Sequence, residues 1–306
     1  MTASEAAALI DRVIDNVEEV IVGQHDAVEH ALVTVLARGH LLLEDVPGVG
    51  KTVLARSIAG SLACSFKRVQ FTPDLLPADV TGSNVFNQKT REFEFRPGPV
   101  FANVVLADEI NRAPPKTQAA LLEAMEEQQV TVDGETRSLP DPFTVIATQN
   151  TVERDQTYDL PMAELDRFTK KLQLGYPDTD DEVAMLERMV GQHPIEELDP
   201  VSTLADLRSA QTATANVTVE EPIREYVTRL ASYTREHAQL GASPRASITL
   251  LRAAQARALL KGRDYVVPDD IQEEIRVVFP HRIQPGATEK IATQLIDDAL
   301  QTVPVE

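Results

Sequence analysis

The chain has 306 residues, which is long enough for two domains with hydrophobic cores of their own. Hydrophobic residues make up 43% of it, and no stretch approaches the roughly 18 successive apolar residues that a membrane span requires. The amino terminus has neither the basic start nor the apolar centre of a signal peptide. These features exclude a membrane-inserted protein and lead us to expect a cytoplasmic one.

The formal net charge is −19, with eight lysines against 21 arginines. An acidic surface repels phosphate backbones, which makes nucleic acid an unfavourable main partner. Because the carboxylates are spread along the whole chain, we interpret them as a halophilic adaptation, in which high salt screens their mutual repulsion. An ordinary acidic protein of the cytoplasm is the alternative.

Two helices are predicted before the first strand, over about residues 6–21 and 26–37, because apolar residues recur there at helical spacing. The apolar run Leu41-Leu42-Leu43 then predicts a buried strand, and residues 53–63 predict a helix. Between them lies Asp45-Val46-Pro47-Gly48-Val49-Gly50-Lys51-Thr52. A strand, a glycine-rich loop, Lys-Thr and a helix form the context of a phosphate-binding P-loop.

The chemistry of this loop follows from its residue types. Gly48 and Gly50 let successive backbone N–H groups turn towards one anion, which also faces the positive end of the following helix. Lys51 can reach the β- and γ-phosphates, and the Thr52 hydroxyl can ligate Mg²⁺. Asp45 stands where a glycine is usual, so its charge beside phosphates needs shielding. An ordinary strand–turn–helix corner is the alternative.

The rest of the chain divides into two parts. Strands and helices alternate first, with strands predicted over 66–71, 104–107, 143–148 and 170–174, helices over 115–127 and 162–168, and hairpins within 72–102 and 129–139. Helices alone follow, over 182–190, 203–211, 221–237, 244–260, 268–277 and 288–300. We therefore predict an α/β domain with a parallel sheet over residues 1–176 and an all-helical domain over 177–306.

Polar residues follow two of the predicted strands, where ligands of parallel sheets bind. Asp108 can accept a hydrogen bond from a metal-bound water, and Glu109 can take a proton from, or orient, the water that attacks a γ-phosphate. The amide of Asn150 could bridge that water and the phosphate. The alternatives are a solvated strand end for the two acids and a turn-forming residue for Asn150.

Two arginines are further candidates. Arg167 lies on the predicted helix 162–168, where its guanidinium could neutralise charge on a γ-phosphate, or could instead pair with a neighbouring acid. Arg245 begins a helix of the second part. A cation there opposes the helix dipole, which favours a role for Arg245 in meeting an anion.

Together these residues resemble the AAA+ ATPases, and most closely the MoxR family. The motifs that carry the resemblance are residues 45–52, 106–125, 147–150, 165–168 and 241–246, and it covers about residues 4–300. It implies a P-loop AAA+ nucleotide-binding domain with a helical lid, hydrolysis of ATP to ADP with Mg²⁺, and a homo-oligomeric ring, expected to be a hexamer.

The resemblance also implies roles for single residues. Nucleotide contacts are expected from Val22, Gly23, Gln24, Pro47, Gly48, Val49, Gly50, Lys51, Thr52, Val53 and Arg245, the last as sensor 2. Thr52 and Asp108 are expected to hold Mg²⁺. The expected catalytic residues are Lys51, Glu109, Asn150 as sensor 1, and Arg167 as an arginine finger that acts on the neighbouring subunit's ATP.

The family is associated with chaperone-like remodelling or metal-cofactor insertion, often with von Willebrand factor A domain partners. Segments 72–102 and 129–139 would line the face or pore of the ring, or else pack on their own domain. A nucleic-acid-dependent motor, such as a clamp-loader or helicase relative, would need basic hairpins, whereas 72–102 carries both signs and 129–139 is nearly neutral. A nucleotide-gated scaffold with little turnover is a third alternative, which Glu109 and Arg167 disfavour.

Overall fold

The computed structural model describes residues 1–150, 157–188, 194–286 and 291–305. Its centre is a five-stranded sheet in the order β2-β5-β8-β1-β9, and every neighbouring pair is parallel. The strands are β1 (Leu41–Asp45), β2 (Phe66–Gln70), β5 (Val104–Asp108), β8 (Thr144–Asn150) and β9 (Lys170–Leu172). The prediction of a parallel α/β sheet is confirmed.

Both faces of this sheet are covered, which explains the continuous apolar strands. Leu41 and Leu43 of β1 belong to a cluster with α1 (Ala3–Glu18), α2 (His25–Leu36) and α3 (Lys51–Ser61). Leu42, between them, belongs to a second cluster with α5 (Pro115–Glu127) on the other face. Successive side chains of a strand point to opposite faces, so a strand buried on both sides needs apolar residues at every position.

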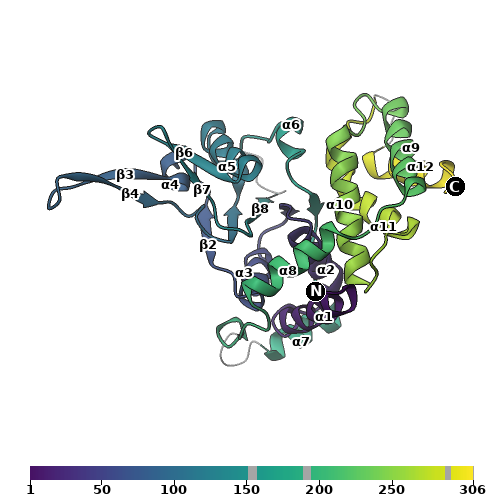
Figure 1. Cartoon of the computed structure of the whole chain (residues 1–306), viewed down its shortest axis with the longest axis horizontal. Coiled ribbons are helices and arrows are strands. Elements are labelled where there is room, and N and C mark those ends of the chain that lie inside the picture. The colour runs from purple at the N-terminus through teal and green to yellow at the C-terminus, as the bar shows by residue number, and fades with distance from the viewer. Residues whose placement is uncertain (151–156, 189–193, 287–290, 306) are drawn as a thin grey trace.

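Two hairpins leave this core. One runs from β3 (Gly82–Asn87) to β4 (Glu92–Pro97) and forms a long arm that projects away from the body of the molecule (Figure 1). The shorter one joins β6 (Gln129–Val132) and β7 (Glu135–Ser138), as predicted. A short helix that we did not predict, α4 (Pro77–Thr81), precedes the arm. Pro77 suits its first position, and the Asp79 carboxylate accepts the Leu76 N–H at 2.9 Å.

The second part is helical, as predicted. Its helices are α7 (Thr179–Arg188), α8 (Leu204–Ala215), α9 (Glu221–His237), α10 (Pro244–Leu260), α11 (Pro268–Val278) and α12 (Ala292–Thr302), with single turns η2 (Pro194–Glu196) and η3 (Pro280–Arg282). The end of the helix predicted over 182–190 and the start of the helix predicted over 288–300 lie outside the described residues. None of the helices in the described part is long and apolar enough to cross a membrane.

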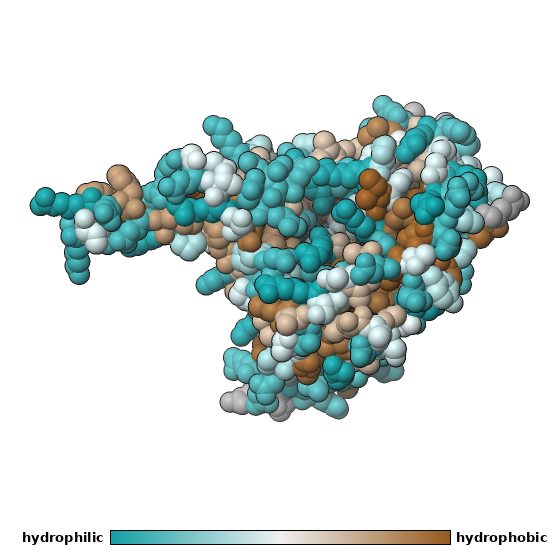
Figure 2. Space-filling view, viewed as in Figure 1, coloured by the Kyte–Doolittle hydropathy of each residue, from teal (hydrophilic) through white to brown (hydrophobic). Residues whose placement is uncertain are grey.

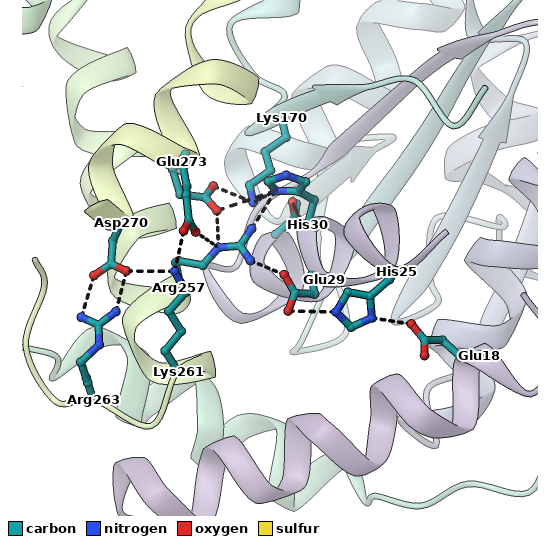
Figure 3. A network of polar contacts seen from close by, with 12 residues as sticks. Glu18, His25, Glu29, His30, Lys170, Arg257, Lys261, Arg263, Asp270 and Glu273 are labelled. Atoms are coloured by element: carbon teal, nitrogen blue, oxygen red, sulfur yellow. Dashed lines mark hydrogen bonds and ion pairs between the residues drawn. The ribbon is translucent and has the colours of Figure 1, made fainter. Parts of the chain in front are cut away.

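Buried charges join the helical part to the sheet (Figure 3). Lys170 of β9 lies with its Nζ 2.6 Å from a carboxylate oxygen of Glu274 in α11, and both side chains are fully buried. Arg257 of α10 reaches the same carboxylate at 2.9 Å and Glu29 of α2 at 2.6 Å. His30 accepts from Lys170 and Arg257, and burial beside these cations lowers its pKa to about 2.

The division of the chain into two domains at residue 176 stays a prediction. In the structure, α8 packs against α2 of the first part as well as against α10 of the second.

Candidate functional site

The predicted P-loop meets Asp108, Glu109 and Asn150 at one edge of the sheet. Because β5, β8 and β1 are adjacent and parallel, their carboxyl ends lie side by side. The register places Asp45 opposite Asn150, and Gln70 opposite Asp108. The Lys51 ammonium lies 3.5 Å from the Gln149 carbonyl at the end of β8. The edge therefore combines the P-loop, the acidic pair and Asn150.

The P-loop has the backbone of an anion cradle. Gly48 and Gly50 have φ angles of 87° and 91°, which side-chain-bearing residues rarely adopt, and α3 begins at the next residue. A Cβ on either glycine would meet no atom of the described residues within 4 Å, so the cradle is open. Lys51 Nζ donates to the carbonyls of Asp45 at 2.8 Å and Val46 at 3.2 Å. Burial lowers the Lys51 pKa, and the opposing effect of the charges on Asp45, Asp108 and Glu109 offsets only part of this shift.

The Asp45 carboxylate is held by three backbone N–H groups. One carboxylate oxygen accepts the N–H groups of Leu174 and Gly175, each at 2.7 Å, and the other accepts its neighbour Val46 at 2.7 Å. Hydrogen bonds from N–H groups stabilise a carboxylate, and here they supply the shielding that the sequence required. Asp45 thus ties the start of the P-loop to the segment after β9.

Asp108 is buried and held from two sides. The Thr148 hydroxyl donates to one oxygen at 2.6 Å. Arg68 of β2 donates to the other oxygen through Nε at 2.9 Å and Nη2 at 2.7 Å. Such pairs orient a carboxylate firmly. Neither partner is predicted by the sequence motifs.

Glu109 lies directly after β5 with a left-handed backbone, at φ 55° and ψ 49°. Its N–H donates to Thr148 Oγ1 at 2.8 Å. Its carboxylate accepts from Gln70 at 2.8 Å and from Arg112 at 2.9 Å. Left-handed geometry is costly for a residue with a side chain, and its occurrence here at a strand end is typical of functional positions. Gln70 and Arg112 were also missed.

These partners had only a weak signal in the sequence. Arg68 and Gln70 are two residues apart on one strand and therefore point to the same side of the sheet. No local sequence feature indicates that β2 pairs with β5. The pairing joins residues about forty positions apart, at separations of 40 for Arg68 and Asp108 and 39 for Gln70 and Glu109. Only the strand order reveals them.

A cavity of about 850 Å³ adjoins the start of α2. Gly23 and Gln24, two of the residues expected to contact nucleotide, line it, and Val22 directly precedes them. Leu174, which hydrogen-bonds Asp45, lines another side. The remaining wall comes from the helical part, through residues of α11, η3 and α12.

Arg167 and Arg245 come together elsewhere, beside a cavity of about 210 Å³. Glu126 of α5 lies between them, with one oxygen 3.0 Å from Arg167 Nε and the other 2.5 Å from Arg245 Nη2. The hydrogen bond from Arg245, aided by the charge of Arg167, lowers the pKa of Glu126. The two cations thus share one carboxylate and face one cavity.

The sheet edge fits a polyphosphate with Mg²⁺. The cradle is open, and the carbonyls that hold Lys51 are partners that a phosphate oxygen can replace. The Thr52 hydroxyl and the Asp108 carboxylate are oxygen donors, the type that Mg²⁺ prefers. Thr52 is half-buried in the first turn of α3, beside Val53. The edge therefore suits a magnesium nucleotide.

Residues 40–170 match the ATPase family associated with various cellular activities (AAA), and residues 230–301 match the AAA lid domain. A Bacillus subtilis (strain 168) protein with the name Uncharacterized protein YeaC is 53% identical over 90% of this chain and 87% of its own. Chaperone MoxR1 of Mycobacterium tuberculosis is 43% identical over 96% of this chain and 81% of its own. Protein MoxR of Methylorubrum extorquens is 31% identical over 98% and 94%.

A solved structure is similar over the whole fold. It is a crystal structure from Cytophaga hutchinsonii ATCC 33406 of a protein described as an ATPase, with a TM-score of 0.92 and 38% sequence identity. The match covers 99% of this chain and 96% of the other. The similarity therefore includes the sheet, the hairpins and the helical part.

Proposed function

This chain belongs to the MoxR family of AAA+ ATPases, and on that basis we propose that it is a ring-forming ATPase that remodels or matures partner proteins. The observation that carries the proposal is the meeting of the P-loop, Asp108, Glu109 and Asn150 at one sheet edge. The relatives named MoxR and Chaperone MoxR1 support a chaperone-like role.

Each residue at the edge has a role in hydrolysis. Lys51 and the N–H groups of the cradle bind the phosphates of ATP, and Thr52 with Asp108 holds Mg²⁺. When bound, Mg²⁺ neutralises charge on the phosphoryl group. Glu109 accepts a proton from the attacking water or orients it, and Asn150 positions that water. Gln70 and Arg112 fix the direction of the Glu109 carboxylate.

The position of Arg167 supports the proposal that the protein forms a ring. Arg167 pairs with Glu126 beside a cavity that it shares with Arg245, whereas Lys51 lies at the carboxyl edge of the sheet. We propose that Arg167 leaves Glu126 to meet the ATP of the next protomer, because a phosphate offers the same oxygen acceptors with more charge. Sensor 2 then acts beside it, through Arg245. A hexamer is the expected assembly.

The arm supports a protein client. Phe86 of β3 pairs with Phe93 of β4, and the centroids of their rings lie 5.4 Å apart in an edge-to-face arrangement. These side chains are 49% and 72% exposed, and apolar atoms stand out near the outer end of the arm in Figure 2. The base of the arm is covered, because Arg137 of β7 stacks on Phe95. Exposed aromatic residues on a projecting element are typical of protein contacts.

We propose that this client surface acts in remodelling or in metal-cofactor insertion, with von Willebrand factor A domain proteins as candidate partners. Client capture can be tested in a Glu109→Gln background, which should hold the ATP state. Replacing Phe86 and Phe93 by serine should reduce captured client at least about fivefold, as loss of an aromatic anchor does. Asn87→Ser with Glu92→Gln changes the next rung and should capture normally. Equal capture by both pairs of changes would reject the arm as the client surface.

Hydrolysis itself is tested by phosphate release. Glu109→Gln should bind ATP but lose turnover by about 10²-fold or more, the usual contribution of a general base. Lys51→Ala should lose binding. Glu123→Gln, an exposed acid on α5, is the matched control and should behave as the parent. A parental rate from Glu109→Gln would remove Glu109 from catalysis.

A further inference from the structure

Arg282 lies at the corner of the helical lid formed by the end of α11 and by η3, which we call the lid corner. This corner is next to the segment that carries Arg167. The Arg282 side chain is 2% exposed, and all five of its N–H groups are used. Nε donates to the Asp166 carboxylate at 2.7 Å, and Nη2 donates to the carbonyls of Asp166 at 3.0 Å and Phe168 at 2.5 Å. Nη1 donates to the Thr169 carbonyl at 3.1 Å and to Val278. Arg282 therefore holds the chain on both sides of Arg167.

Other lid residues hold the same segment. His281 contacts the Phe168 carbonyl through Nε2 at 3.0 Å. Two residues further along the chain, the Lys170 ammonium lies 2.6 Å from the Glu274 carboxylate. Four residues of the segment are thus attached to α11 and η3 by polar contacts, namely Asp166, Phe168, Thr169 and Lys170. A movement of this lid corner has to move the Arg167 backbone with it.

The same corner also lines the cavity beside Gly23 and Gln24, which we call the base cavity because these residues are expected to contact the nucleotide. Val277 at the end of α11, Pro280 and His281 line the cavity of about 850 Å³ together with Gly23 and Gln24. One short piece of lid therefore contacts both this cavity and the Arg167 segment.

We propose that Arg282 is a positioning residue for Arg167, and that through it a nucleotide in one protomer's base cavity sets the finger offered to the next protomer. This inference rests on the proposed ring ATPase. The physical reason is that one planar guanidinium with five donors fixes Asp166, Phe168 and Thr169 at once. A lysine has three donors and cannot reproduce this fork.

The first test is Arg282→Lys, with binding and turnover measured separately. Nucleotide affinity, from titration with a fluorescent ADP analogue, should stay within about twofold. Phosphate release should fall about 10²-fold, the usual loss when a catalytic group is misplaced by about 1 Å. Arg263→Lys is the matched control, because Arg263 forks onto Asp270 at 2.7 and 2.8 Å within the lid. It should hydrolyse ATP at the parental rate.

The second test separates positioning from a general structural defect by mixing subunits. Arg282→Lys protomers keep an intact Glu109, and Glu109→Gln protomers keep an intact finger. Mixed rings should therefore recover part of the activity, once subunit exchange is verified. A mixture of Arg282→Lys with Arg167→Ala should recover none, because both lack a placed finger. If Arg282→Lys does not fold, Asp166→Asn keeps the carbonyl contacts of Arg282 and should show the same mixing pattern with a smaller loss.

The outcomes distinguish this inference from the proposed function. Parental activity in Arg167→Ala would overturn the finger, and with it both proposals. An inactive Arg167→Ala beside a fully active Arg282→Lys would overturn the positioning role alone. So would recovery of activity in the mixture of Arg282→Lys with Arg167→Ala, or a loss of nucleotide affinity that accounts for the whole loss of turnover.

Discussion

Arg68 and Asp108 form a two-pronged ion pair across the junction of β2 and β5, with Nε and Nη2 at 2.9 and 2.7 Å from one carboxylate oxygen. Asp108 is the residue proposed to hold Mg²⁺. A guanidinium on its oxygen competes with a cation for the same charge. Arg68 is thus a built-in competitor at the proposed magnesium position.

Removing that competitor should ease metal binding. In Arg68→Ala we expect the Mg²⁺ concentration for half-maximal ATP hydrolysis to fall by a factor of about 1.4 to 5, because a partly exposed ion pair contributes about 0.2–1 kcal/mol. The measurement is a magnesium titration at saturating ATP. Lys67→Ala, the adjacent exposed cation of β2, should leave the midpoint unchanged. A higher midpoint in Arg68→Ala would mean that Arg68 assists the metal site.

Asp45 should matter for stability more than its half-buried neighbour Glu44. Asp45→Ala removes the acceptor for three backbone N–H groups and should lower the free energy of unfolding by about 2 kcal/mol. Glu44→Ala, which loses an ion pair with Lys171, should cost less than about 1 kcal/mol. Denaturant melts at one pH compare the two. Equal losses would contradict the anchoring role of Asp45.

His40 should make the fold sensitive to acid. Its Nδ1 accepts the Val145 N–H at 3.0 Å, so its Nε2 donates to the Met125 carbonyl at 3.1 Å, and full burial lowers its pKa to about 4. The unfolded chain, with an ordinary histidine pKa near 6.5, binds this proton first. The contribution of the neutral His40 ring to stability is therefore complete above pH 6.5. It is lost as the pH drops to 4, by up to about 1.4 kcal/mol per pH unit.

The variant His40→Asn should flatten that part of the pH profile, measured as the free energy of unfolding between pH 6.5 and 4. His237→Asn, at an exposed ring, should keep the parental slope. The slope is compared rather than the absolute stability, because loss of the ring also costs packing. An unchanged slope in His40→Asn would show that other groups account for the acid response.

The net charge of −19 predicts a dependence on salt. The melting temperature should rise from low salt to molar KCl, since screening reduces repulsion among carboxylates. Sucrose at matched osmolality is the control for a general excluded-solute effect. A melting temperature that is flat or falls in KCl would remove the halophilic interpretation.

The sequence by itself determined those features whose causes are local. Glycines at 48 and 50 permit the left-handed turns that they adopt, and the uninterrupted apolar runs are typical of strands buried on both faces. Alternating strands and helices then require a parallel sheet, and carboxyl ends of parallel strands meet at one edge. The sequence alone therefore predicts that Asp108, Glu109 and Asn150 share one site.

The tertiary structure alone decided which side chains act on those residues. The predicted helix 162–168 ends at Leu165 in α6 (Met162–Leu165), because lid contacts made by Arg282 hold the residues beyond it. Arg68 reaches Asp108 only because β2 lies next to β5, and Asp45 meets Leu174 at a separation of 129 residues. Such contacts depend on strand order and domain packing. Neither periodicity nor a motif records them, since both describe only neighbours along the chain.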